Sequence, residues 1–285
     1  MKISVVMLTC NGGPKLKDVV EKLSRQQVEA EVELIAVDSQ SDDGSCEILR
    51  NGGFQVHSIE RKTFSFGPAR DFAFQSSSGD IIVTQSQDVV PIDETYLRVI
   101  TDGIVNGEAD VVQGGTASPP GDDTIFLWDR KGRFYFTSEG REFFQKCGRI
   151  GLSCVCLAIS RDAWKATGFG ETPYCSDKFL QRKLVEKGFR ISRTRGPVVW
   201  HGHAYDLKAL VKRCLNEGVG WRVAGAKYSV PMFLRDLTVG FARNASPWCK
   251  CVCSGHARDL GSIFFFQIRP ICVLIGNRVL KQVVR

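Results

Sequence analysis

The sequence lacks several features that would place it in specialised protein classes. No stretch is apolar for the roughly 20 residues that a membrane-spanning helix needs, so we expect no such helix. No internal repeat or low-complexity segment is present, which argues against a solenoid or a disordered chain. The first apolar run, Ile3–Leu8, is shorter than the hydrophobic region of a signal peptide, and we interpret it as a buried strand. No G-x-G-x-x-G motif follows it, which disfavours a dinucleotide-dependent oxidoreductase.

The composition is that of a globular chain with one strongly basic end. The 285 residues are 43% hydrophobic and 24% charged, which suits one large α/β domain with a smaller appendage. The formal net charge is +7, and residues 241–285, with seven basic residues and one acid, carry a net +6. A local positive patch predicts an anionic partner surface, either a membrane or a polyanion.

The eleven cysteines do not form the pattern of a disulfide framework. Their number is odd and their spacing is irregular in a long chain. We therefore expect reduced thiols and a cytoplasmic location.

The first half of the chain alternates predicted strands with predicted helices. This order predicts a parallel sheet with helices on both faces, in which ligands bind beyond the carboxyl ends of the strands. Thr9, Asp38 and Asp88 all fall at those ends. The predicted strands are Ile3–Thr9, Val32–Val37, Gln55–Ile59, Ile81–Thr84 and Ala109–Gln113.

The second half is less regular. We predict a strand at Ser153–Ser160 and a helix at Asp177–Lys187, and we expect helices from Leu207 onward. The predicted domains are 1–205, divided into a nucleotide-binding half (1–115) and an acceptor half (116–205), and a C-terminal helical extension, 206–285.

Two polar constellations follow the predicted strands. In Val37–Ser45, Asp38 precedes a turn rich in Asp and Gly, so it can bind a base or ribose, although the same residues also suit an ordinary turn. The second constellation runs from Phe64 to Pro91. It contains Phe64-Ser65-Phe66-Gly67-Pro68-Ala69-Arg70-Asp71 and Gln87-Asp88-Val89-Val90-Pro91.

These segments resemble motifs of the inverting GT-A glycosyltransferases of family 2, most closely the rhamnosyltransferase-like branch. The family patterns are V-D-S-x-S-x-D-G-S/T, F-x-H-G-x-x-R-N and Q-D-A-x-P. The similarity continues through Ala158–Arg161 and Ser176-Asp177 to His201–Tyr205, which is like the family's H-S-H-x-Y. It covers about residues 1–220 in the same order. The resemblance implies an α/β GT-A fold, a Rossmann-like and mostly parallel sheet, with a C-terminal helical extension.

The resemblance also implies an activity and a set of roles. The activity is transfer of a sugar, with rhamnose from a dTDP donor as first candidate, from a nucleotide-diphospho-sugar to a hydroxyl of a glycan or lipid-linked glycan. No nucleic-acid partner is expected. Thr9, Asp38 and Arg70 would contact the donor, and Asp88 would hold a Mg²⁺–diphosphate or Mn²⁺–diphosphate. Asp177 would be the catalytic base and His203 a further metal ligand, with His201 the second choice.

Four positions depart from the family pattern. The usual D-x-D is Ser86-Gln87-Asp88, with one carboxylate, but one Asp, one His and two phosphate oxygens can still hold Mg²⁺ or Mn²⁺ with waters, so we expect a divalent metal. Ser176 stands where relatives have Glu, Asp71 where they have Asn, and Phe66 where they have His. We expect Asp71 and Phe66 near the donor, where they would bear on the identity of the sugar.

Other interpretations of these residues remain open. Asp177 can simply cap its helix, and the two histidines can serve packing. A sugar-phosphate nucleotidylyltransferase shares this type of sheet, but its Gly-rich phosphate loop is only weakly imitated by Cys10–Lys15, which has no arginine. A non-catalytic glycan-binding protein of the same fold is the third alternative.

The C-terminal segment predicts a membrane-binding helix. We expect it to run over Pro270–Arg285, with an apolar stripe that includes Ile271 and Ile275 and a basic opposite side. Such a helix would lie on an anionic membrane without crossing it. The alternative is that its stripe packs on the catalytic domain or on a partner subunit.

Overall fold

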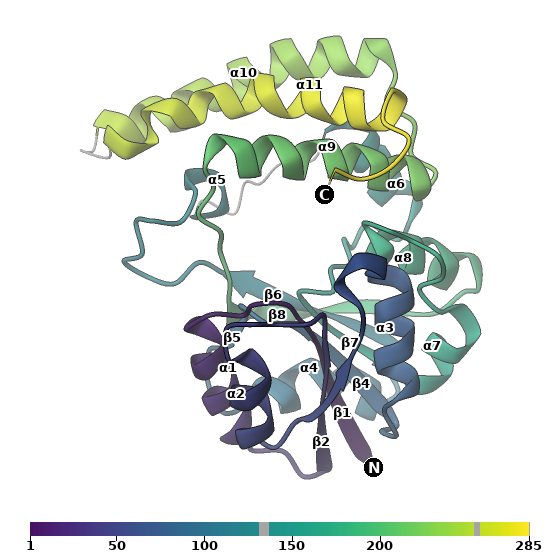
Figure 1. Cartoon of the computed structure of the whole chain (residues 1–285). Helices are drawn as coiled ribbons and strands as arrows, with labels where there is room; N and C mark the ends of the chain where they lie inside the picture. Colours follow the sequence, from purple (N-terminus) through teal and green to yellow (C-terminus); the bar gives the residue numbers. More distant parts are fainter. Residues whose placement is uncertain (131–136, 254–256, 285) are drawn as a thin grey trace. The chain divides into compact units, whose positions relative to one another are not determined.

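The computed structural model describes residues 1–130, 137–253 and 257–284 (Figure 1) and forms two compact units that are interleaved along the sequence. Among the tail residues of the basic patch, the side chains of Arg243, Lys250, Arg258, Asp259 and Arg285 lie outside the described part. The predicted consecutive domains, 1–205 and 206–285, stay a prediction. The first unit contains Met1–Ala117, Ile150–Thr172 and Ser176–His201; the second contains Ser118–Arg149, Pro173–Cys175 and Gly202–Arg285.

The first unit is built on an eight-stranded, mostly parallel sheet with the order β3-β2-β1-β4-β7-β6-β8-β5. The strands β3, β2, β1 and β4 are parallel, as the alternating sequence pattern predicts, and β7 is antiparallel to both β4 and β6. The carboxyl ends of β1, β2 and β4 therefore meet at one edge of the sheet. The bounds are β1 Lys2–Thr9, β2 Glu31–Asp38, β3 Gln55–Ser58, β4 Ile81–Ser86, β5 Val90–Pro91, β6 Val111–Ala117, β7 Cys156–Ser160 and β8 Ile191–Trp200.

Helices cover both faces of this sheet (Figure 1). Because successive side chains of a strand point to opposite faces, Val5 and Val6 of β1 belong to two separate apolar cores. Val5 packs in the core that contains Leu16 and Ile100, and Val6 in the core that contains Phe74. The helical elements are α1 Lys15–Ser24, α2 Ser45–Asn51, η1 Arg61–Thr63, α3 Phe66–Gln75, α4 Tyr96–Val105, α7 Arg161–Thr167 and α8 Ser176–Glu186.

The second unit is helical, as expected for the C-terminal extension. Within it α9 and α11 pack against each other, and glycines allow the two backbones to approach: a Cβ on Gly276 would lie 2.0 Å from the carbonyl oxygen of Leu215. None of the described helices is long and apolar enough to cross a membrane. The elements are α5 Leu127–Arg130, α6 Ser138–Lys146, α9 Leu207–Val223, α10 Val230–Cys253, η2 Ala257–Phe264 and α11 Phe265–Arg278.

The last helix differs from the predicted one. It begins at Phe265 and ends at Arg278, so Pro270 lies inside it instead of at its start. Buried aromatic contacts explain the earlier start, since Phe265 and Phe266 pack edge-on against Phe126 and Trp128. Asn277, which the helical spacing of the predicted helix places on its basic side, is buried, and its amide donates to the carbonyls of Gly218 and Ala226.

Candidate active site

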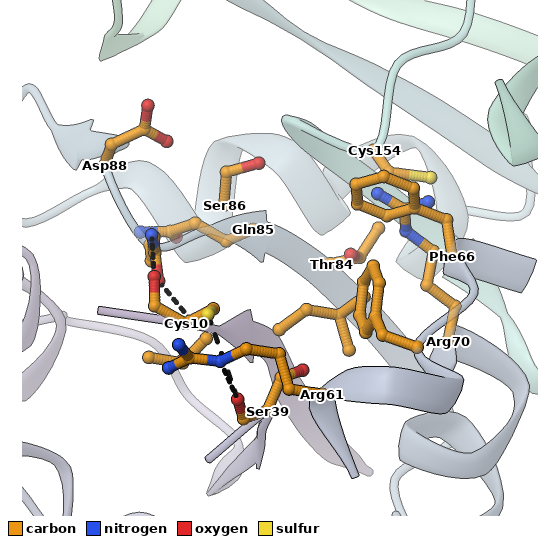
Figure 2. Close-up of a pocket in the computed structure, with 14 residues that line it drawn as sticks. Cys10, Ser39, Arg61, Phe66, Arg70, Thr84, Gln85, Ser86, Asp88 and Cys154 are labelled. Atoms are coloured by element: carbon orange, nitrogen blue, oxygen red, sulfur yellow. Dashed lines mark hydrogen bonds between the residues drawn. The ribbon is translucent and has the colours of Figure 1, made fainter. Parts of the chain in front are cut away.

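A pocket of about 410 Å³ opens at the carboxyl ends of β1 and β4 in the first unit. Figure 2 shows Asp88 at one end of the lining residues and Phe66, Arg70 and Cys154 gathered at the other. The position agrees with the general rule for ligand sites in open α/β sheets. The pocket is lined by Leu8, Thr9, Cys10, Ser39, Arg61, Phe64, Phe66, Arg70, Thr84, Gln85, Ser86, Gln87, Asp88 and Cys154.

Thr9 and Asp38, both predicted to bind the donor, have different surroundings. Thr9 lines the pocket, and its hydroxyl has no hydrogen-bond partner among the described residues. Asp38 is buried at the end of β2, and its carboxylate accepts from the backbone and the hydroxyl of Ser41 (2.8 and 2.5 Å). Asp38 therefore holds the loop that carries Ser39 to the pocket, as the interpretation as an ordinary turn expects. A contact between Asp38 and the nucleotide stays a prediction.

Hydrogen bonds tie the loop after β1 to its neighbours. The amides of Gly12 and Gly13 donate to Ser45 Oγ (2.9 Å) and Asp43 Oδ2 (3.0 Å). The amide of Cys10 donates to Gln87 Oε1 (2.9 Å). These amide groups therefore already have protein acceptors, and Cys10, at the start of the loop, lines the pocket.

Arg61 is a pocket residue that sequence reasoning missed. Its guanidinium donates to the carbonyl oxygens of Ser39 (3.1 Å) and Gln40 (2.6 Å), as Figure 2 shows for Ser39. The signal in the sequence was weak, since Arg61 stands in a short 3₁₀ turn outside every motif.

Arg70 lies on α3 at the other end of the pocket. Its guanidinium stacks over the rings of Phe66 (5.0 Å) and Phe169 (5.8 Å) and donates through Nη1 to the hydroxyl of Ser176. Its Nε is buried without a hydrogen-bond partner among the described residues. Since Ser176 is the first residue of α8, Arg70 connects the pocket to the helix that carries Asp177.

Asp88 follows β4 and lines one end of the pocket. Its Oδ2 lies 3.7 Å from Nε2 of His201, a residue of the same unit. Two ligands of one Mg²⁺ or Mn²⁺ ion at about 2.1 Å lie roughly 3–4 Å apart, so this pair fits a shared ion. The side chain of Gln87 bonds to the backbone of Cys10, which leaves Asp88 as the acidic ligand of the Ser86-Gln87-Asp88 segment.

His203, the first-choice metal ligand from the sequence, belongs to the second unit. Its Nδ1 lies 3.2 Å from Oδ2 of Asp129, and its ring stacks on Tyr205 at 5.2 Å. Its metal role stays a prediction. The second choice, His201, is the histidine that lies beside Asp88 in the first unit.

Asp177 lies in the first turn of α8. The helix starts at Ser176, so Asp177 is not at the N-cap position. Its Oδ1 accepts from the backbone of Lys178 (2.9 Å) and its Oδ2 is 3.5 Å from Lys178 Nζ, which also donates to the carbonyl of Leu152. The carboxylate thus lies at the start of α8 with the Lys178 ammonium as a neighbour.

Asp71 does not line the pocket, although we expected it near the donor. Its carboxylate accepts from Trp164 Nε1 (2.9 Å) and from the amides of Phe169 (2.9 Å) and Gly170 (2.8 Å). It therefore holds the loop that leads toward α8. Phe66, in contrast, lines the pocket as expected.

Cys154 is the thiol at the back of the pocket. Burial raises the pKa of Cys154 to about 12, although the nearby Arg70 opposes this. The thiol stays protonated at neutral pH, so it contributes shape and not a nucleophile.

Comparison with known proteins identifies the family. The profile of Glycosyl transferase family 2 matches residues 4–167, more than half of the chain. The chain belongs to glycosyltransferase family 2. This family 2 enzyme is 23% identical over 231 residues to the O-antigen chain rhamnosyltransferase RfbN of Salmonella typhimurium, covering 77% of this chain and 72% of that protein.

Solved structures establish that the fold is GT-A. Glucosyl-3-phosphoglycerate synthase from Mycobacterium tuberculosis, in complex with Mn²⁺, uridine diphosphate and phosphoglyceric acid, superposes with a TM-score of 0.61 at 19% identity, covering 80% of each chain. The same enzyme with Mg²⁺ and uridine diphosphate gives a TM-score of 0.62 at 19% identity, covering 80% of this chain and 81% of that one. The predicted family, fold and enzyme class are confirmed.

Proposed function

We propose that this glycosyltransferase moves a sugar from a nucleotide-diphospho-sugar to a hydroxyl of a glycan or lipid-linked glycan, with inversion at the anomeric carbon. The observation that carries the proposal is the Arg70–Ser176 hydrogen bond, which joins the donor pocket to the helix of Asp177. A donor in the pocket and a base on α8 are the two parts that an inverting displacement needs.

In the proposed reaction each residue has a separate task. Asp177 accepts the proton of the acceptor hydroxyl as the oxygen attacks the anomeric carbon, and the bond to the nucleoside diphosphate breaks. Asp88 and His201 would hold a Mg²⁺ or Mn²⁺ ion, which when bound neutralises the charge of the leaving diphosphate. Thr9 and Arg70 would position the donor. The Mn²⁺ and Mg²⁺ in the solved relatives support this metal choice.

Rhamnose is the first donor sugar to test. The relative RfbN is a rhamnosyltransferase, which supports this choice. The apolar rings of Phe64 and Phe66, 4.9 Å apart at the pocket, also suit a 6-deoxy sugar, because its methyl group replaces a hydroxyl.

The proposed place of action is the cytoplasmic face of a membrane, where a lipid-linked acceptor would be presented. No disulfide joins any of the ten cysteines that the structure describes, which supports a reducing compartment.

The nucleotidylyltransferase alternative is less well supported. That chemistry needs free loop amides and an arginine after the first strand to bind the donor phosphates. Here the amides of Cys10, Gly12 and Gly13 are already bonded within the protein.

Product analysis tests the proposal. The protein is incubated with nucleotide sugars, dTDP-rhamnose first, and Mn²⁺, and the phosphate product is identified by chromatography. Sugar transfer or donor hydrolysis releases nucleoside diphosphate, whereas nucleotidyl transfer releases pyrophosphate. Release of pyrophosphate would overturn the proposal, and turnover of no donor would favour a non-catalytic glycan-binding protein.

A further inference from the structure

The second unit exposes an unusual share of apolar side chains. Of the fourteen exposed large hydrophobic side chains in the described residues, ten lie between residues 207 and 284. Single exposed apolar side chains are normal on protein surfaces, but a concentration in one segment marks an interaction surface.

Four of these ten side chains form one stripe along α11 and its two flanking residues, Phe264 and Val279. Phe264, Ile271, Ile275 and Val279 are 61%, 44%, 38% and 70% exposed, and their spacing of seven, four and four residues places them on one side of a helix. Ile268, half-buried, falls on the same side. We call these five residues the outer stripe.

The opposite side of α11 is already occupied. Phe265, Cys272, Val273 and Gly276 are buried, and α11 packs there on α9 within the second unit (Figure 1). Within the second unit α11 packs on both α9 and α10. Phe264, Ile271, Ile275 and Val279 of the outer stripe nevertheless stay exposed, so they are open to a further apolar partner.

The net charge of residues 202–285 indicates which kind of partner would bind the outer stripe. Residues 202–285 contain 13 Lys or Arg and 4 Asp or Glu, a net charge of +9, whereas residues 1–201 contain 25 and 27, a net of −2. Glu217 pairs with Arg213 and Arg269, and the buried Asp236 pairs with Arg141. Within residues 202–285 these internal pairs use two acids and two basic residues, so the excess stays at +9.

We propose that the second unit binds an anionic lipid bilayer, with the outer stripe of α11 inserted among the headgroups and the basic residues on the lipid phosphates. The second unit offers exposed apolar side chains, and residues 202–285 carry an excess of positive charge, which is the combination that an anionic bilayer takes up. The helix lies in the plane of the membrane, because its 14 residues reach only about 21 Å and cannot cross it. The binding face is therefore the stripe that begins at Phe264, and not a helix that starts at Pro270.

Vesicle sedimentation with the full chain tests this inference, and it does not depend on the proposed reaction. The probes are phosphatidylcholine vesicles with and without about 30% phosphatidylglycerol, at low and high salt. The wild-type protein is expected to pellet with the anionic vesicles and to be released by salt, since salt screens exposed charges. The double variant Ile271→Ser/Ile275→Ser is expected to bind about tenfold or more weakly, because burial of each CH₂ contributes about 0.8 kcal/mol.

The matched control is Val105→Ser, which removes an exposed apolar side chain from α4 of the first unit and leaves vesicle binding unchanged. Circular dichroism melts confirm that all variants fold. Equal pelleting of the wild type and the double variant would overturn the inference, and so would a wild-type protein that stays in the supernatant. A dimer in sedimentation velocity that the double variant abolishes would also overturn it, because a second copy would then cover the stripe.

Discussion

Four aspartates in and around the pocket differ in their surroundings. Asp38 and Asp71 accept from protein donors and hold loops. Asp88 lines the pocket beside His201, and Asp177 lies at the start of α8 beside Lys178. The sequence assigns both Asp38 and Asp88 to the donor. An Asp at the end of a strand and before a turn has the same sequence pattern whether its carboxylate binds a ligand or accepts hydrogen bonds within the turn, so the two roles cannot be distinguished without the structure.

Replacing the proposed base tests its role directly. Asp177→Asn keeps the shape of the side chain but cannot take up a proton, so the transfer rate is expected to fall by about 10²–10⁴-fold. Donor affinity, measured by calorimetry, should stay the same. Glu186→Gln at the other end of α8 is the control and should retain full activity. A rate for Asp177→Asn above half of the wild-type rate would place the base elsewhere.

Asp71 is expected to matter for stability. Asp71→Asn restores the residue of the family pattern, but its amide group offers one acceptor oxygen to Trp164, Phe169 and Gly170. The loss of acceptors for these donors should lower the free energy of unfolding by about 1–3 kcal/mol. Urea denaturation measures this, with the exposed loop variant Asp42→Asn as control. Equal stability of the two variants would contradict the loop-holding role.

Local elements were predictable where the sequence pattern is continuous. The predicted strand Ile3–Thr9 corresponds to β1, and the predicted helix Asp177–Lys187 to α8, each within one residue at both ends. Both elements are specified by residues close together in the sequence: β1 by a continuous apolar run and α8 by apolar residues at helical spacing. The start of α11 was not predictable, because it depends on contacts of Phe265 and Phe266 with residues more than 130 positions away.

The helix α9 is expected to position the loop that precedes Asp177. A Cβ on Gly220 would lie 2.5 Å from the sulfur of Cys175, so Gly220→Ala should displace the Pro173–Cys175 loop. Since Asp177 follows this loop, the transfer rate should fall about tenfold or more, because small misplacements of catalytic groups are costly.

Steady-state kinetics with a rescue variant test this positioning. Adding Cys175→Gly to Gly220→Ala removes the clashing side chain, and glycine tolerates the φ of +53° at this position, so activity should return. Gly261→Ala, where a Cβ meets nothing within 4 Å, is the control. An unimpaired Gly220→Ala enzyme, or a double variant no better than the single one, would contradict the role of α9.

At the scale of the whole molecule, the stability of the second unit should depend on pH through Glu139. Burial raises the pKa of Glu139 to about 7, which outweighs the hydrogen bond from Thr137 and the attraction of Arg269. Between about pH 4.5 and 7 the folded protein therefore holds a proton that the unfolded chain has lost, so the contribution of Glu139 to stability falls as pH rises through this window.

The variant Glu139→Gln removes this dependence. Its free energy of unfolding relative to wild type should rise between pH 5 and pH 8 by up to about 3 kcal/mol, from a shift of about 1.4 kcal/mol per pKa unit. Chemical denaturation across this pH range measures the difference, with the exposed neighbour Glu142→Gln as control. A difference that does not change with pH would show that Glu139 is ionised throughout.

The proposed function of the whole molecule depends on metal-assisted donor binding at Asp88. The most direct measurement is calorimetric titration of the full chain with dTDP and UDP, with and without Mn²⁺, for wild type and Asp88→Asn. At least one nucleotide is expected to bind, and Mn²⁺ should strengthen its binding. Asp88→Asn should remove the metal effect and weaken binding about tenfold or more, a loss of roughly 1.4 kcal/mol. Binding of neither nucleotide, or equal affinity and an equal response to Mn²⁺ in the two proteins, would contradict metal-assisted donor binding at Asp88.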